Sequence, residues 1–291
     1  MQQRTLRRAI RLSGTGLHLG EMAKIVLHPA PAHTGIRFQD AVAPTKAVAA
    51  TYKHVQRDTL GFCTRLHDAS SGYAIATVEH VLAALSAARI HNCIVETSGP
   101  ELPVFDGSSQ PILAAIAAVG PEEQAALQPF IEVLRPVSVV HKDKAAHLVP
   151  RPLASAPELV VSVEVDFRHK GLPRNWLSVP LDEFDAIASA RTFTFRDDIA
   201  QLQKMDLARG GSLDNAVVFD EGTPLNPDGL RHPIEWVQHK ALDCFGDLAL
   251  AGMPLHGHYT GICPGHALTH ELLLALFASS DNYRVVVHKD N

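Results

Sequence analysis

One predicted helix, IEWVQHKALDCFGDLALA, is apolar over most of its surface, as expected for a helix that is buried in a core. Glu235, His239, Asp243 and Asp247 nevertheless follow one another at steps of four, which places them on one face. A histidine and an acid four residues apart can bind one metal ion, because both side chains project the same way. The alternative is that Asp243 merely pairs with Lys240 on a solvated face. The fold of this chain therefore has to bury this helix and supply its polar side chains with a metal ion, an ion pair or hydrogen bonds.

A second ionisable pair lies in TVEHVLAALSAARI, residues 77–90, whose apolar residues predict another helix. Glu79 and His80 are adjacent in it, so their side chains point about 100° apart. One of them could ligate a metal while the other accepts a proton from a metal-bound water. A catalytic zinc site typically has three protein ligands and such a water. His80, His239 and Asp243 would form such a set, with Glu79 as the base. The alternative is a hydrogen-bonded core histidine beside a surface glutamate.

The histidines of CPGHALTHELL leave three interpretations open. His266 and His270 are four residues apart and could both be metal ligands. Alternatively, His266 follows a Pro-Gly pair at a helix start and projects into a site as an acid or base. The third interpretation is two half-exposed histidines without a specific role.

The segment SARTFTFRDDIAQLQKMDLARGGS joins a loop to a helix. Thr192 lies at the junction, a place where hydroxyl groups often donate to a substrate. Phe193, Phe195, Ile199 and Leu202 could form an apolar pocket, although such spacing is also typical of an ordinary core.

The composition excludes several classes of protein. With 46% hydrophobic and 20% charged residues, the 291-residue chain is expected to be globular. Its net charge of −5 offers no basic excess for general nucleic-acid binding. The start of the sequence lacks an apolar signal-peptide region, and no apolar run approaches the ~20 residues that span a bilayer. None of the four cysteines forms a C-x-x-C pair, and we expect a cytoplasmic, reducing location.

Strands and helices alternate along both halves of the chain. Strand-like runs include KIVLHPA, IRFQD and CIVETS in the first half and ELVVSVEVDF and YRVVVH in the second. Each half also has at least two helical segments, and PEEQAALQP (121–129) is the predicted linker between them. VFDGSS, with its Asp-Gly pair, is interpreted as a structural turn. The pattern predicts an N-terminal α+β domain over 1–125 and a C-terminal α+β domain over 130–291.

Taken together, these segments resemble the UDP-3-O-acyl-N-acetylglucosamine deacetylase family (LpxC), the zinc amidohydrolases of lipid A synthesis. The matching segments follow the family's order over almost the whole chain: RTL, TGLHLG, RDT, TVEH, DGSSQP, ARTFTF, GGSLDNA, HKALDCFGDL and GHAL. The combination of TVEH, HK-x-x-D-x-x-G-D and GHAL is specific, whereas each piece alone is weak. The resemblance implies hydrolysis of the acetamide of UDP-3-O-acyl-N-acetylglucosamine, the committed step of lipid A (lipopolysaccharide) biosynthesis.

The resemblance also implies roles for single residues. One zinc ion per chain, or ferrous iron in its place, would be bound by His80, His239 and Asp243. Glu79 is implied as the general base and His266 as the general acid, with Asp247 orienting His266. The implied contacts to the substrate and the developing oxyanion are Thr192 and Lys240.

Further substrate contacts are expected around these residues. Lys144 and Phe167 resemble the family's nucleotide-side contacts, and Cys63 and Phe193 resemble positions near the sugar and acyl group. Because an acyl chain needs an apolar passage, we expect Phe193, Ile199 and Leu202 to contribute to one. Cys263 stands where the family usually has a lysine, so the contact of that lysine to the diphosphate is in question.

The implied fold is two similar two-layer α/β sandwich domains, packed helix layer to helix layer, with the site between them. We expect a monomer that binds a UDP-linked acylated amino sugar and no nucleic acid, and contact with a membrane surface is compatible with this. Two other functions stay open: a zinc deacetylase of another acylated amino sugar, and a non-catalytic protein that binds the lipid precursor.

Overall fold

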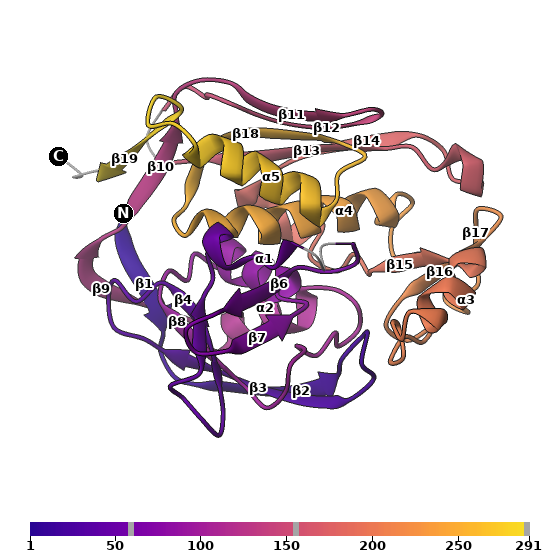
Figure 1. Cartoon of the computed structure of the whole chain (residues 1–291), viewed down its shortest axis with the longest axis horizontal. Helices are drawn as coiled ribbons and strands as arrows, with labels where there is room; N and C mark the ends of the chain where they lie inside the picture. The colour runs from indigo at the N-terminus through magenta and orange to yellow at the C-terminus, as the bar shows by residue number, and fades with distance from the viewer. Residues whose placement is uncertain (58–60, 154–156, 288–291) are drawn as a thin grey trace.

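Helices lie between two layers of sheet in this protein, as the computed structural model shows for residues 1–57, 61–153 and 157–287 (Figure 1). In Figure 1 the sheet of the second half lies above the helices and the sheet of the first half lies below them. Helix α1 of the first half packs directly against α4 of the second half. This arrangement confirms the predicted α+β fold, in which two helix layers face each other.

The first half is built on a sheet with the strand order β2-β3-β8-β4-β5. These strands are β2 (Ile10–Thr15), β3 (Met22–Pro29), β4 (Ile36–Asp40), β5 (Ala47–Ala49) and β8 (Cys93–Thr97). A hairpin of β6 (Arg65–Asp68) and β7 (Tyr73–Ala76) precedes α1 (Glu79–Ala87), and α2 (Gln110–Val119) follows β8. In β3, buried Ala23, Ile25 and Leu27 alternate with more exposed residues, because successive side chains of a strand face opposite sides.

The second half has the larger sheet, in which β18 pairs with β12, β13 and β10. Its strands are β10 (Pro129–Val133), β11 (Val137–His141), β12 (Lys144–Val149), β13 (Leu159–Val165), β14 (Asn175–Pro180), β18 (Leu255–Ile262) and β19 (Tyr283–Val287). Helices α4 (Glu235–Leu248) and α5 (His266–Phe277) cover it. A smaller unit joins β15 (Phe193–Phe195), α3 (Arg196–Lys204), β16 (Val217–Asp220) and β17 (Thr223–Pro224).

The two halves share one topology, although the sequence contains no clear repeat. The path β11-β12-β18-β13-β14 has the same order as β2-β3-β8-β4-β5, and each corresponding pair runs in the same sense. Along these two paths the pairing is antiparallel except for one parallel pair in each half, β8 with β4 and β18 with β13. Helices α1 and α4 occupy equivalent places, as do α2 and α5. The expectation of two similar domains therefore agrees with the observed strand order.

The predicted linker is an ordered strand rather than a connecting loop. Residues Pro121–Leu127 form β9, which pairs antiparallel with β1 (Gln2–Leu6) at the start of the chain. Its polar residues suit this position because every residue of β9 is at least partly exposed. We propose that the domain boundary lies between residues 125 and 130, where the chain passes from β9 to β10.

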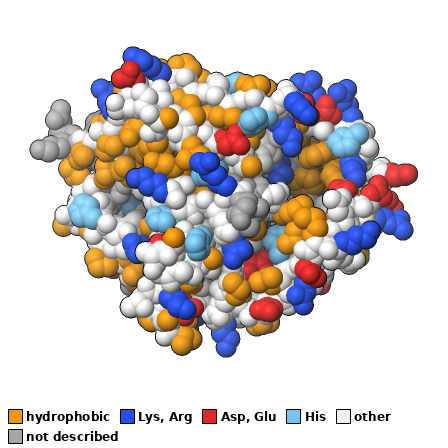
Figure 2. Space-filling view, viewed as in Figure 1, with side chains coloured by type: hydrophobic (Ala, Val, Ile, Leu, Met, Phe, Trp, Pro, Cys, Tyr) orange, Lys and Arg blue, Asp and Glu red, His pale blue; other side chains and the backbone are white. Residues whose placement is uncertain are grey.

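The outer surface mixes side chains of different kinds. On the face seen in Figure 2, lysine and arginine side chains are interspersed with acidic and hydrophobic ones. None of the described helices is long and apolar enough to cross a membrane.

Candidate metal centre and active site

The first turn of α1 lies directly against α4, and this contact brings together two motifs that are far apart in the sequence. Gly246 permits it, since a Cβ atom at this position would lie 2.0 Å from the carbonyl oxygen of Glu79. Glycine is used where one backbone approaches another this closely. Every residue of α4 except Lys240 is buried, which confirms the prediction of a buried helix.

Three side chains from the two helices converge in one buried cluster. His80 comes from α1, and His239 and Asp243 come from successive turns of α4. The Nε2 atoms of His239 and His80 lie 3.4 and 3.5 Å from Oδ1 of Asp243. All three ligand atoms lie within 4.8 Å of one another, and the described residues contain no other such group of three.

These separations fit one divalent cation. In a tetrahedral zinc site with bonds of about 2.0–2.2 Å, neighbouring ligand atoms lie roughly 3.4 Å apart. His239 donates its Nδ1–H to the carbonyl of Ala190 at 3.0 Å, which leaves Nε2 as the acceptor that a metal requires. Two imidazoles and one carboxylate also leave coordination positions for other ligands, as in catalytic zinc sites.

The charge states of the cluster also suit a cation. Burial lowers the pKa of His239 to about 4, so the imidazole is neutral at neutral pH. Burial alone would raise the pKa of Asp243, but the neighbouring His239 and the Lys240 ammonium hold it well below its usual range. Lys240 donates from Nζ to Oδ2 of Asp243 at 3.0 Å. The Lys240–Asp243 pair considered as an alternative therefore exists, but Asp243 is only 5% exposed and contacts both histidines.

Glu79, His266 and Asp247 form a second buried group beside this cluster. His266 donates its Nδ1–H to Oδ2 of Asp247 at 2.8 Å, and its Nε2 lies 3.9 Å from Oε1 of Glu79. Burial lowers the pKa of His266, but the charge and hydrogen bond of Asp247, helped by Glu79, outweigh it and raise that pKa to about 9. Burial raises the pKa of Glu79, against the opposing effect of His266. The site therefore holds a protonated imidazole facing a carboxyl group of increased basicity.

His270 has a different environment from His266. It is buried, and its Nε2–H donates to the carbonyl of Tyr52 at 2.9 Å. Of the three interpretations of this segment, the structure thus supports the one in which only His266 projects into a site.

The residues around Thr192 lie at the edge of the metal cluster. Thr192 directly precedes β15, and its N–H donates to the carbonyl of Gly107 at 2.8 Å. The ring of Phe193 lies 6.4 Å from that of His239, and Nζ of Lys240 lies 5.7 Å from the centre of the Phe193 ring. Phe167 packs edge-on against Phe193, with ring centroids 5.7 Å apart. The rings of Phe193 and Phe167 therefore form a continuous contact between the metal cluster and the smaller β15–α3–β16 unit.

The other predicted substrate residues are less closely grouped. Ile199 and Leu202 are half-buried on α3, which packs against β15 and β16. Cys63 is buried near Glu79, and burial, with that carboxyl, raises the pKa of the thiol to about 12. Lys144 begins β12 and is exposed. Of the RDT motif, residues 58 and 59 lie outside the described residues.

Thr64 belongs to the site although no sequence pattern identifies it. Its hydroxyl donates to Oδ1 of Asp247 at 2.6 Å, and its backbone N–H donates to Oε2 of Glu79 at 3.1 Å. It is 1% exposed. Thr64 therefore holds both carboxyl groups of the acid–base group, and only their proximity in the fold reveals this role.

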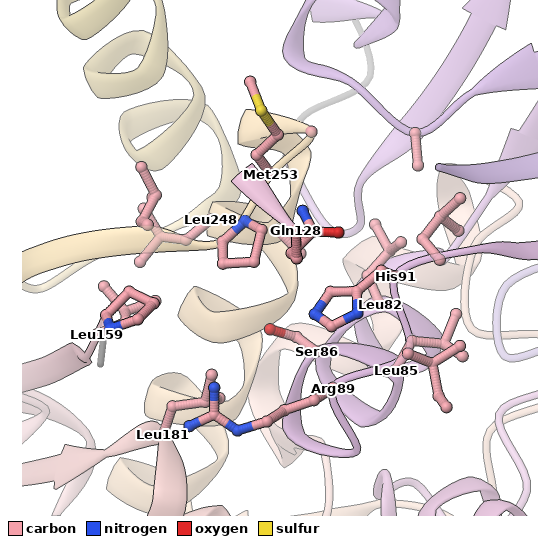
Figure 3. A pocket seen from close by; sticks show the side chains of 18 of the residues that line it. Leu82, Leu85, Ser86, Arg89, His91, Gln128, Leu159, Leu181, Leu248 and Met253 are labelled. Atoms are coloured by element: carbon pink, nitrogen blue, oxygen red, sulfur yellow. The ribbon is translucent and has the colours of Figure 1, made fainter. Parts of the chain in front are cut away.

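A separate pocket of about 90 Å³ lies at the C-terminal ends of α1 and α4 (Figure 3). Most of the side chains labelled around it are aliphatic: Leu82, Leu85, Leu159, Leu181, Leu248 and Met253. Arg89, which also lines it, forms an ion pair with Asp182 of the second half. None of the ligand or acid–base residues lines this pocket, so it is separate from the metal cluster and the acid–base group.

Comparison with known proteins gives one consistent family. The family model described as LpxC, UDP-3-O-acyl N-acetylglycosamine deacetylase, matches residues 3–278. A UDP-3-O-acyl-N-acetylglucosamine deacetylase of Shewanella piezotolerans is 38% identical over 290 residues, with 98% of this chain and 92% of the relative covered. A protein of the same name from Phenylobacterium zucineum is also 38% identical over 290 residues, with 98% of this chain and 96% of the relative covered. The region matched by the family model includes both halves of the chain and all residues of the metal cluster and the acid–base group.

Proposed function

This chain belongs to the LpxC family of UDP-3-O-acyl-N-acetylglucosamine deacetylases, and we infer that it hydrolyses the acetamide of UDP-3-O-acyl-N-acetylglucosamine. The products are acetate and the UDP-linked acylated glucosamine, and the reaction belongs to lipid A biosynthesis. The observation that carries this inference is one cluster, in which His80, His239 and Asp243 meet beside Glu79 and His266. A non-catalytic binding protein would need neither a buried base nor a buried acid.

We propose that His80, His239 and Asp243 bind one zinc ion, with ferrous iron as the alternative. Their donor set of two imidazole nitrogens and one carboxylate oxygen suits either metal. When bound, the ion would polarise the substrate carbonyl and lower the pKa of the attacking water. Adding each metal in turn to metal-free protein and measuring acetate release would identify the active one.

The protein's own groups supply the proton transfers. Glu79 accepts a proton from the water as its oxygen bonds to the acetamide carbon, and the Thr192 hydroxyl donates to the carbonyl oxygen as negative charge develops there. His266 donates its Nε2 proton to the amide nitrogen as the C–N bond breaks, because an unprotonated amine is a poor leaving group. Asp247 stabilises the protonated His266 through the hydrogen bond to Nδ1. Lys240, beside Phe193, is proposed to contact the substrate.

Substrate recognition is proposed for the surfaces next to this centre. The contact of Phe193 with Phe167 supports an apolar path from the metal cluster, and half-buried Ile199 and Leu202 on α3 extend it toward the acyl chain. Cys63, buried near Glu79, is proposed to lie beside the sugar. Lys144, which is exposed, is proposed to contact the nucleotide.

We propose that the protein acts as a monomer in the cytoplasm. Both parts of the metal cluster come from one chain, which supports action as a monomer. The four cysteines are free thiols, which supports a reducing, cytoplasmic location.

Acetate release tests the function directly. With UDP-3-O-acyl-N-acetylglucosamine as substrate, we expect stoichiometric acetate and free amine, and loss of both products after a chelator removes the metal. Readdition of zinc should restore the rate. Faster turnover of an acylated amino sugar without the nucleotide would indicate the alternative substrate, and no acetate from any of these substrates would exclude catalysis.

The pH dependence should change when Asp247 is replaced by asparagine. The charge of Asp247 raises the pKa of His266, and His266 acts as an acid only below that pKa. Asp247→Asn should therefore move the alkaline limb of the kcat/KM profile to lower pH, by about one to three units. Thr64→Val removes a hydrogen bond to Asp247 but leaves the charge of Asp247 in place. The alkaline limb of the kcat/KM profile of this variant should therefore move less. An unchanged limb in Asp247→Asn would contradict the assignment of His266 as the acid.

A further inference from the structure

Glu235 is the member of the α4 stripe that neither the metal cluster nor the acid–base group uses. It is 1% exposed and lies one helical turn before His239. Its carboxylate accepts four hydrogen bonds, from the backbone N–H, Nε and Nη2 of Arg191 and from the backbone N–H of Arg231, at 2.8–3.1 Å. A buried carboxylate with so many donors has little freedom to move.

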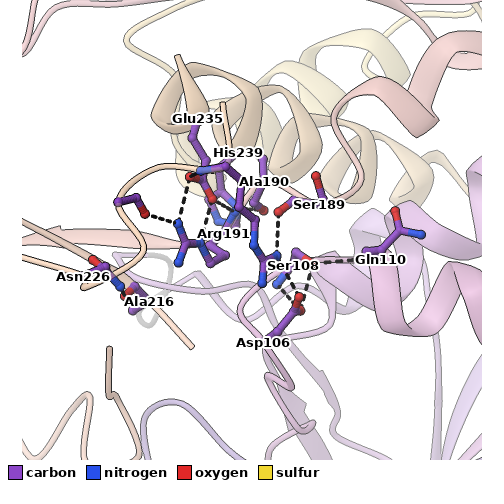
Figure 4. A network of polar contacts seen from close by, with 12 residues as sticks. Asp106, Ser108, Gln110, Ser189, Ala190, Arg191, Ala216, Asn226, Glu235 and His239 are labelled. Atoms are coloured by element: carbon purple, nitrogen blue, oxygen red, sulfur yellow. Dashed lines mark hydrogen bonds and ion pairs between the residues drawn. The ribbon is translucent and has the colours of Figure 1, made fainter. Parts of the chain in front are cut away.

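One peptide group joins Glu235 to His239 (Figure 4). Its N–H, on Arg191, donates to Oε1 of Glu235 at 3.0 Å. Its carbonyl, on Ala190, accepts the Nδ1–H of His239 at 3.0 Å. The two side chains therefore hold opposite ends of the same peptide group from neighbouring turns of α4. A carboxylate bound to the N–H also polarises the peptide and strengthens its carbonyl as an acceptor.

The surrounding contacts keep this peptide in place. Nη2 of Arg191 donates to the carbonyl of Gly229 at 2.8 Å. Nη1 of Arg231 donates to the carbonyl of Ser189 at 2.9 Å and to Oδ2 of Asp106 at 2.8 Å. Hydrogen bonds therefore connect the segment that carries the Ala190 carbonyl to the loop before α4 and, through Arg231, to Asp106 of the first half. Figure 4 shows these contacts meeting around the segment beside His239.

We propose that Glu235 is a positioning residue for the metal centre: through the Ala190–Arg191 peptide it holds the His239 ring in the form that presents Nε2 to the ion. Metal-bound histidines usually donate their other N–H to a carboxylate or a carbonyl, and this partner raises their basicity. Here a carboxylate acts on the histidine through one intervening peptide. The proposal rests on the proposed function only in taking His239 as a ligand.

The test measures metal affinity rather than activity. Glu235→Gln places an amide NH2 group among hydrogen-bond donors, which disturbs the peptide while keeping the side-chain size. Metal-free protein would be titrated with Co²⁺ in competition with a chelator, and the absorption of bound Co²⁺ would report the geometry. We expect affinity to fall about 10- to 100-fold, with an altered spectrum and with the protein folded. Glu158→Gln, which breaks the Arg151–Glu158 ion pair, is the matched control and should bind as the wild type does.

The outcomes separate this proposal from the metal assignment. Wild-type affinity and spectrum in folded Glu235→Gln, with binding lost in His239→Ala, would overturn the role of Glu235 alone. Unchanged binding in His239→Ala would instead overturn the ligand assignment. If Glu235→Gln does not fold, ¹⁵N NMR of the wild-type metal-free protein decides: His239 should carry its proton on Nδ1, and a proton on Nε2 would refute the proposal.

Discussion

Replacing Glu79 with glutamine is expected to lower acetate release by about 10²- to 10⁴-fold, the usual contribution of a positioned general base. Gln has nearly the same size but cannot accept the proton of the attacking water. The side chain of Glu79 is not among the ligand atoms of the metal cluster, so the bound metal should remain at one ion per chain. Measuring kcat and metal content on the same sample checks both parts of this expectation.

His80→Ala is the matched comparison, because His80 follows Glu79 directly but contributes a ligand atom. This variant should lose both activity and bound metal, and excess zinc should restore part of the activity only if the remaining ligands still bind. Full activity in Glu79→Gln would remove Glu79 as the base. Full metal content in His80→Ala would show that the ion binds elsewhere.

Gly246→Ala is expected to be among the most disruptive single substitutions of α4. The added Cβ would lie 2.0 Å from the carbonyl oxygen of Glu79, so one of the two helix backbones has to move. Overpacking a core typically costs about 1–3 kcal/mol and occasionally more, which would lower the unfolding midpoint by several degrees. The movement would also separate His80 from His239 and Asp243, so metal affinity should fall in the protein that remains folded. Thermal unfolding and metal titration measure the two effects.

Gly99→Ala is the control, since no atom lies within 4 Å of a Cβ built at that position. It should unfold and bind metal nearly as the wild type does. Equal behaviour of Gly246→Ala and Gly99→Ala would mean that α1 and α4 can move apart without cost. The close contact would then not be what aligns the two parts of the metal cluster.

The proposed ligands on α4 could be predicted because helical spacing is local. His239, Asp243 and Asp247 lie four residues apart, and any helix places such residues on one face. The adjacency of Glu79 and His80 is also evident from the sequence. That this pair meets α4 is only one of two interpretations of the residues themselves, and the resemblance favours it, because periodicity does not say which helices pack together.

The segment 121–129 shows the limit of composition as evidence. Its polar residues predict a linker, yet residues 121–127 form strand β9 because they pair with β1 at the start of the chain. Strand pairing depends on a partner distant in sequence, so a short polar strand has no clear local signal.

The buried helix α4 and its stripe at steps of four are predictable from the residues alone, because they follow from the helical repeat, and the Glu79–His80 pair is read directly from two adjacent positions. The contacts of each polar group, in contrast, depend on how distant segments pack together. Thr64 reaches Asp247 across 183 positions, and Glu235 reaches His239 through a peptide at residues 190 and 191. Such contacts arise when separate segments pack together, and their partners are buried polar groups that find hydrogen bonds only in the complete fold.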